Sequence, residues 1–270
     1  MTASDTPTRE QILISSNAAE QAFGTRVVEI ADGTCRATTL VPPRSDSSGW
    51  LGPLADVLLA RAAMSVDGAP MGCRTIDLRI DLLTATDHPG GTVVGRGVLR
   101  DLDDGFALSE ATIEAADGRP IARCVGRLRM VAASPDHIRR YAVEADNQLT
   151  TRSLPELFGL RWRARTDAGG LLEVAGDPAV GNPFGVMHGG AQHSLLVVAA
   201  EEFCRPDPER WRVLDATMAY LASMPACGPD LTAAVTVDGR TRNLLRLRLE
   251  FRTTRGTVAS GTVTMRRVDG

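Results

Sequence analysis

The chain has 270 residues, of which 43% are hydrophobic, and a formal net charge of −3. This length allows one large domain or two of ordinary size, and the composition is that of a globular protein. Positive charge is not concentrated in any long run, which argues against a nucleic-acid or anionic-membrane surface. No apolar stretch approaches the roughly 18 residues of a membrane-spanning helix.

Two further features bear on location and on metals. Residues 1–10 are polar and lack the basic-then-apolar order of a signal peptide. The five cysteines are dispersed without CxxC spacing, which is typical of reduced thiols in a cytoplasmic protein. The four histidines form no zinc-like cluster. We therefore expect a cytoplasmic protein that needs no metal ion.

The first half of the chain alternates strand-like runs with one apolar segment. A run over residues 23–28 and a second run ending at Leu40 flank a turn at Asp32-Gly33. Residues 54–65 are apolar nearly all round, which predicts a buried helix. Four alternating runs follow, and the turns between them contain glycine. These runs are 75–83, 92–101, 106–116 and 120–131.

The second half repeats this order. Phe158-Gly159 takes the place of Phe23-Gly24, and the apolar segment 191–204 again predicts a buried helix. The four runs after it are 214–224, 231–237, 244–252 and 256–267. We predict an α+β fold of two similar units, each with one long helix against an antiparallel sheet. The units would span residues 1–131 and 154–270, joined by a polar linker at 132–153 that is partly helical around 137–144.

The most informative motif lies just before the second helix. Asn182 precedes the sequence His188-Gly189-Gly190, and an apolar run follows. Adjacent glycines let backbone N–H groups come close to a ligand. A helix that begins here also directs its unpaired N–H groups and the positive end of its dipole at the same spot. These are the features that stabilise a developing oxyanion.

The pattern resembles the hotdog fold, and specifically the PaaI-like acyl-CoA thioesterases. The resemblance rests on the Asn182 and His188-Gly189-Gly190 loop, on Leu54-Ala55-Asp56, and on the strand runs that begin at Thr75 and near Asp215. It implies a double hotdog, in which the two units form a pseudo-dimer with one continuous sheet around two buried helices. It also implies hydrolysis of an acyl-CoA to a free acid and CoA. The CoA moiety then belongs to the substrate, so no cofactor is expected.

In that family the site lies between two hotdog units, and this chain divides the expected residues between its halves. The second half supplies Asn182 and the loop, with Gly189 as the oxyanion donor, His188 orienting the loop or polarising the carbonyl, and Gly190 contacting the substrate. The first half supplies the acid, Asp56, and a hydroxyl, Thr75. The opposite pseudo-symmetric site would hold Trp50 and Val197, and we expect it to be filled or inert.

Several of these residues have a structural alternative. Asp56 could complement the helix dipole, Asn182 could hold the turn before Pro183, and Thr75 could be an ordinary strand residue. His193 is interpreted as structural. Arginines along residues 242–252 could meet CoA phosphates, but a solvated strand face explains them better.

Three functions remain open at this stage. The leading one is an acyl-CoA thioesterase, with a small-molecule acyl-CoA as partner and with room for a homo-oligomer of the double hotdog. The second is a non-catalytic acyl-CoA-binding module, because the second half lacks the acid. The third is a hotdog dehydratase, for which the sequence shows no convincing pair of a histidine and an acid.

Overall fold

The computed structural model describes residues 8–42, 47–83, 90–132, 149–205 and 210–268. The strands in these ranges form one twelve-stranded antiparallel sheet in the order β1-β2-β4-β5-β6-β3-β9-β12-β11-β10-β8-β7. The first six strands come from the first half of the chain and the last six from the second. Their bounds are β1 Arg26–Ala31, β2 Thr34–Val41, β3 Gly72–Leu82, β4 Gly91–Asp103, β5 Phe106–Ala115, β6 Pro120–Val131, β7 Leu160–Thr166, β8 Gly169–Gly176, β9 Arg210–Tyr220, β10 Cys227–Arg240, β11 Leu244–Thr253 and β12 Gly256–Val268.

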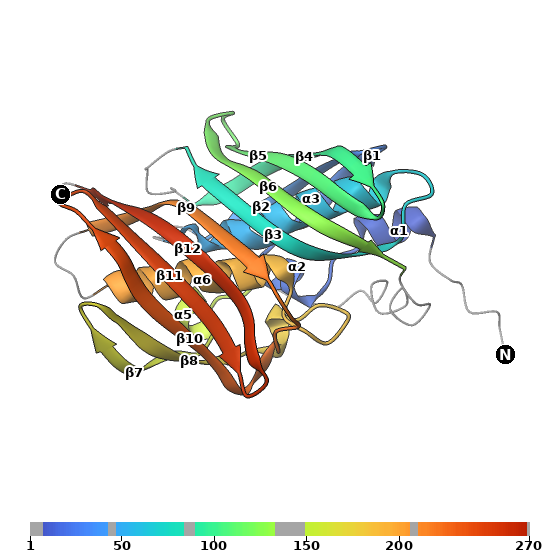
Figure 1. The fold of residues 1–270 in the computed structure, drawn as a ribbon. Coiled ribbons are helices and arrows are strands. Elements are labelled where there is room, and N and C mark those ends of the chain that lie inside the picture. The colour runs from blue at the N-terminus through green and yellow to red at the C-terminus, as the bar shows by residue number, and fades with distance from the viewer. Residues whose placement is uncertain (1–7, 43–46, 84–89, 133–148, 206–209, 269–270) are drawn as a thin grey trace.

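Two long helices fill the inside of this curved sheet (Figure 1). They are α3, Gly52–Ser65, and α6, Gly189–Cys204, and nearly every side chain of both is buried. The helices begin two residues earlier than the apolar runs predicted, because Pro53 is well suited to a first helical turn and the His188 side chain caps the start of α6. The fold is the predicted double hotdog.

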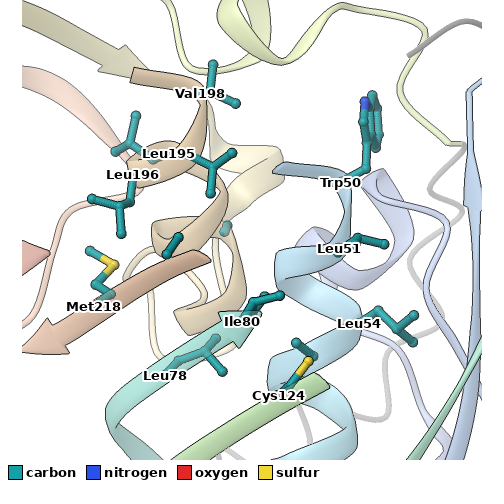
Figure 2. Packing of buried hydrophobic residues seen from close by; sticks show 14 of the residues in the cluster. Trp50, Leu51, Leu54, Leu78, Ile80, Cys124, Leu195, Leu196, Val198 and Met218 are labelled. Carbon is teal, nitrogen blue, oxygen red and sulfur yellow. The ribbon is translucent and has the colours of Figure 1, made fainter. Parts of the chain in front are cut away.

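The two halves are joined through the middle of the sheet by β3 and β9. These strands pair in antiparallel register from Asp77 opposite Ala219 to Asp81 opposite Asp215. Figure 2 shows Leu78 of β3 and Met218 of β9 among the buried hydrophobic residues around the two helices. Because the sheet continues across this seam, the halves share one hydrophobic core.

The N-terminal ends of α3 and α6 cross at two glycines. A Cβ atom on Gly52 would overlap the Gly190 carbonyl, and a Cβ atom on Gly190 would overlap the backbone of Gly52 and Pro53. This close approach requires residues without a side chain. It places the first turn of each helix against the other half of the molecule.

Some elements differ from the sequence-based expectation. Two short helices, α1 at Arg9–Ile14 and α2 at Ala18–Ala22, precede the first strand and were not predicted. Strand β9 ends at Tyr220, earlier than expected, because the chain then turns back to bond Met224 to Met187. The described chain also contains one short helix, α5 at Leu154–Leu157, and two 3₁₀ turns, η1 at Ser48–Leu51 and η2 at Pro178–Val180. The linker expected at 132–153, with its helix around 137–144, lies mostly outside the described residues.

The packing of α3 on β4 gives a test of the fold. A Cβ atom on Gly97 would overlap the backbone carbonyl of Leu58, which cannot move without shifting the buried helix. We predict that Gly97→Ala lowers the free energy of unfolding by about 1–3 kcal/mol, the usual cost of overpacking. Gly239→Ala is the matched control, because a Cβ there meets nothing within 4 Å. Urea unfolding followed by circular dichroism measures both variants, and equal stabilities would contradict the packing described.

Candidate active site

The residues predicted from opposite halves of the chain meet around the carboxylate of Asp56. This side chain lies one turn into α3 and is 6% exposed. Thr75 of β3 donates its hydroxyl to Oδ1 at 2.7 Å, and the backbone N–H of Gly190 donates to Oδ2 at 3.1 Å. The structure therefore brings Asp56 and Thr75 of the first half to the glycine loop of the second.

The loop glycine next to Asp56 has an unused backbone donor. A Cβ atom on Gly189 would lie 2.8 Å from Asp56 Oδ2 and 2.9 Å from Thr75 Oγ1, so only glycine fits here without displacing the site. Gly189 is the first residue of α6 and is half-buried. Within the described part of the chain, its N–H has no hydrogen-bond acceptor. A free N–H at a helix N-terminus is suited to an anionic oxygen.

His188 lies between two carboxylates. Its Nδ1 accepts the N–H of Gly190 at 3.1 Å and is 3.5 Å from Asp56 Oδ2, while its Nε2 is 3.7 Å from Glu20 Oε1. Burial opposes a charge on the ring, but the Glu20 and Asp56 carboxylates outweigh it and raise the pKa of His188 above its ordinary value. The imidazole is therefore coupled to the acid on which the site depends.

Glu20 belongs to a buried ion pair at the inner end of the site. Its Oε1 is 3.2 Å from Nη2 of Arg61, and both side chains are 3% exposed. Burial alone would disfavour the charge, but Arg61 and His188 hold the pKa of Glu20 below its ordinary value. The network runs without a break from Arg61 through Glu20 and His188 to Asp56.

Asn182 serves the loop in the way its structural alternative proposed. Its side-chain oxygen accepts the backbone N–H of Phe184 at 2.9 Å and of Val186 at 3.4 Å, which closes the turn before His188. It also lines the cavity next to Asp56. Its contact with a substrate stays a prediction.

Tyr220 fixes the same loop from the sheet. Its hydroxyl donates to the carbonyl of Gly189 at 2.9 Å. Burial raises the pKa of Tyr220 well above its ordinary value, so the hydroxyl stays protonated and remains a donor. Gln192 adds a second support, since its side-chain nitrogen donates to the carbonyl of Met187 at 2.8 Å. Neither residue was identified from the sequence.

A cavity of about 520 Å³ opens onto Asp56. It lies where β3 and β9 separate beyond their last pair, Asp77 with Ala219, so residues on both sides of the opened seam line it. Val57, Ala60 and Met64 of α3 give it an apolar wall. Arg74 and Arg129, opposite each other on β3 and β6, are exposed and line it as well.

A thiol in this cavity is not a nucleophile. Cys73 lines the space, but burial and the charge of Asp56 raise the pKa of its thiol to about 12. It is therefore a neutral thiol at physiological pH. Within the described ranges, no group of three histidine, cysteine or carboxylate side chains is arranged to hold a metal ion.

The opposite pseudo-symmetric position is occupied by protein. The bulge at Ile76 in β3 has a counterpart at Leu214 in β9. The residue numbers of this pair differ by the same amount as those of Gly52 and Gly190, which meet where the helices cross. This offset makes Ser194 the counterpart of Asp56, which corrects the expectation that Val197 stands there. Ser194 donates its hydroxyl to the carbonyl of Gly49 at 2.6 Å.

Trp50 takes the place of His188 on that side and is 4% exposed. Figure 2 shows Trp50 among the buried hydrophobic residues beside α3, in the core that Val198 of α6 also shares. Its ring packs edge-on against Phe23 at 5.4 Å between centroids. Glu201 accepts hydrogen bonds from Ser47 and Ser48 at the start of η1. This side offers neither a carboxylate in the place of Asp56 nor a free glycine loop.

Two residues of this network, Glu20 and Arg61, can be recognised as unusual from the sequence. Asn17 and Glu20 form a capping box, and an Asn followed three residues later by Glu marks a helix start. Arg61 interrupts an otherwise apolar helix, which indicates a buried charge that needs a partner. What no pattern revealed is that the two signals belong to one ion pair.

The fold is that of hotdog proteins, and in this chain Asp56 and the glycine loop meet between the two units. Residues 178–266 match the family model described as the acyl-CoA thioesterase N-terminal domain, although here that match falls in the second half of the chain. No curated protein matches this chain. Among the described helices, none combines the length and the apolar character needed to cross a membrane.

Solved structures of similar shape cover nearly the whole chain at low sequence identity. A hotdog-fold protein of unknown function from Alicyclobacillus acidocaldarius has a TM-score of 0.63 and 14% identity, covering 94% of this chain and 99% of that one. Acyl-CoA thioesterase II TesB2 from Mycobacterium marinum has a TM-score of 0.58 and 13% identity, covering 97% and 99%. The 12:0-ACP thioesterase from Umbellularia californica has a TM-score of 0.57 and 13% identity, covering 87% and 94%. These likenesses show the double hotdog fold.

His193 lies outside the site and gives a test of pH-dependent stability. It is 1% exposed, and its Nε2 contacts the carbonyl of Ala216 at 3.1 Å. Burial lowers the pKa of His193 to about 4. Between about pH 6.5 and 4 the unfolded chain binds a proton there that the folded chain does not, so stability falls as the pH falls.

We predict that this histidine alone reduces the free energy of unfolding by about 1.4 kcal/mol for each pH unit below about 6.5. His193→Gln keeps a donor for Ala216 but does not titrate, so its stability should depend less on pH in this window. Urea unfolding at a series of pH values compares the two proteins. Parallel curves would contradict a buried neutral His193.

Proposed function

We propose that the protein is an acyl-CoA thioesterase of the PaaI-like type, which hydrolyses an acyl-CoA to a free acid and CoA. The observation that carries the proposal is the meeting of the Asp56 carboxylate with the free N–H of Gly189 at the end of a cavity. A carboxylate and an unused backbone N–H that line the same cavity supply the base or nucleophile and the oxyanion donor that acyl transfer to water requires.

The reaction would use these groups in a fixed order. Asp56 either attacks the thioester carbonyl carbon or takes a proton from a water that attacks it. As the carbonyl oxygen becomes negative, the N–H of Gly189 donates to it, and the dipole of α6 adds to the stabilisation. The C–S bond then breaks, and the CoA sulfur leaves as the thiolate and takes up a proton. Where water attacked, the free acid is formed directly; where Asp56 attacked, water hydrolyses the acyl–Asp56 anhydride, which releases the free acid and restores the carboxylate. CoA belongs to the substrate, so the proposal requires no cofactor.

Thr75 and Gly190, of which Gly190 was expected to contact the substrate, prepare the acid rather than touch the carbonyl. Each donates a hydrogen bond to a different oxygen of Asp56, which fixes the orientation of the carboxylate. Tyr220 and Gln192 hold the loop that carries Gly189. Such fixed geometry is what separates a catalytic carboxylate from a buried one that merely has partners.

The same geometry bears on assembly and location. Both halves of the site come from one chain, so the proposed activity needs no partner subunit, and a homo-oligomer remains an expectation. The described cysteines are free. This supports the proposed cytoplasmic location, where thiols stay reduced.

The alternative function is an acyl-CoA-binding module without catalysis. It would use the same cavity and leave the thioester intact. Release of free CoA, followed with a thiol reagent on a panel of acyl-CoAs, separates the two functions. The oriented carboxylate beside an unused N–H favours the enzyme, because binding alone requires neither.

The acid gives the most direct test. Asp56→Asn preserves the shape of the side chain and one of its two acceptor oxygens but can neither accept a proton nor attack, so we predict a loss of kcat of roughly 10²–10⁴-fold. Asp81→Asn is the control, because that exposed carboxylate of β3 pairs with Arg79 away from the cavity, and it should keep wild-type kcat. Wild-type turnover in Asp56→Asn would refute the assignment.

The arginines beside the cavity test the choice of carrier. Arg74 and Arg129 are like charges directly opposite each other, an arrangement that a bound phosphate would stabilise. We predict that Arg74→Ala raises KM for an acyl-CoA by about two- to fivefold with little change in kcat, as for an exposed ion pair. Arg246→Ala, an exposed arginine of β11, should leave KM unchanged.

The substrate can be varied as well as the protein. An acyl-pantetheine has the thioester but lacks the phosphates, so its KM should not respond to Arg74→Ala. An equal effect on acyl-CoA and acyl-pantetheine would mean that Arg74 does not bind phosphate. A phosphopantetheine group can come from CoA or from an acyl carrier protein. Comparing the KM of an acyl-CoA with that of an acyl carrier protein substrate distinguishes these two sources.

A further inference from the structure

Glu20 is a buried carboxylate that the proposed reaction does not use. It lies in α2, a short helix outside both long helices, and is 2% exposed. Its oxygens are within 2.6 Å of Asn17 Nδ2, 3.2 Å of Arg61 Nη2 and 3.7 Å of His188 Nε2. A buried charge is costly, so its presence next to the site calls for a role.

The surroundings of Glu20 hold it in one position. Its other oxygen accepts the backbone N–H of Asn17 at 3.2 Å, which completes a capping box. Arg61 is itself fixed, because its guanidinium also donates to the carbonyls of Ile12 and Ser15. Because both oxygens of Glu20 already accept hydrogen bonds from protein donors, Glu20 has little room to bind a substrate group. Its remaining neighbour is the His188 ring, which its charge attracts.

We propose that Glu20 is a positioning residue, which holds the Nε2 side of the His188 ring and thereby directs Nδ1 towards Gly190 and Asp56. The expected effect of Glu20 on turnover rests on the proposed function, whereas its effect on the position and titration of His188 does not. A proton on Nε2 faces Glu20, so Nδ1 is left to accept the N–H of Gly190. That same N–H also bonds to Asp56, so the ring and the acid share one donor.

The charges around His188 predict how the titration of this histidine should change when each neighbour is removed. Glu20 from α2 and Asp56 from α3 favour the protonated ring, whereas Arg61 from α3 opposes it. Tyr220 of β9 and Thr75 of β3 contact the same site as neutral groups. Removing Glu20 and removing Arg61 break the same ion pair, yet they should move the titration of His188 in opposite directions.

The first experiment measures that titration by NMR, with His188→Ala identifying the signal of the ring. In Glu20→Gln we expect the midpoint to fall by about one pH unit or more. In Arg61→Met, which removes the same ion pair with a side chain of similar length, we expect the midpoint to rise. An unchanged midpoint in Glu20→Gln, or a fall in both variants, would overturn the proposal, because general damage to α2 would affect both alike.

A second variant covers the case in which Glu20→Gln does not fold. The double variant Glu20→Gln/Arg61→Met leaves no unpaired charge in the core and removes both influences on His188. Because the attraction of Glu20 is the stronger, its midpoint should fall below that of the wild type. A midpoint at or above the wild-type value would overturn the proposal.

Turnover gives an independent reading. Since Glu20 acts through His188, Glu20→Gln should lower kcat more than it changes KM, and should add no further loss when His188 is already alanine. A further loss in the His188→Ala background would show that Glu20 acts by another route. If the wild type releases no CoA from any acyl-CoA, the proposed function fails, while the NMR titration still decides whether Glu20 positions His188.

Discussion

The contact between Gly52 and Gly190 is the constraint on which the rest of the structure depends. Because neither residue has a side chain, the first turns of α3 and α6 come together at the centre of the molecule. This brings Asp56 within hydrogen-bonding distance of the backbone of the other half. A larger residue at either position would separate the two helices and leave the acid without the loop that orients it.

Around this contact the two halves have become unequal. One side of the crossing holds a continuous chain of polar groups from the buried Arg61 to the partly exposed Thr75, and the other side holds Trp50 and Ser194 within the core. Buried polar groups are tolerated only when they are paired, and the pairing here is nearly complete. Within the described residues of this site, the half-buried N–H of Gly189, which the proposed reaction needs to be free, has no acceptor, and the buried Oε1 of Gln192 has no donor.

The sequence predicted the fold because its signals are local and repeated. Apolar segments long enough for a buried helix and alternating runs between glycine turns occur twice in the same order, and each half confirms the interpretation of the other. The motif that contains His188 and Gly189 could be recognised for the same reason. Its partner Asp56 was assigned by resemblance, and the structure brings the two together.

What the sequence could not supply is the set of contacts between distant segments. Nothing local connects Glu20 with Arg61 or Tyr220 with Gly189, because these pairs depend on how the helices and the sheet pack. The prediction that Val197 is the counterpart of Asp56 in the second half was also wrong. The crossing of the helices and the strand bulges fix which residues of the two halves correspond, and they make Ser194 the counterpart of Asp56.

The covalent joining of the two units has a consequence for how such a protein can change over time. In a homodimer of identical hotdog units, every substitution is introduced into both sites at once, so a bulky residue that fills one site also destroys the other. In a single chain a substitution in one half does not change the other half, so a tryptophan at residue 50 leaves His188 unchanged. The fused chain could therefore convert one of two equivalent sites into packing and devote the other to specialisation, a division that is closed to its symmetric counterparts.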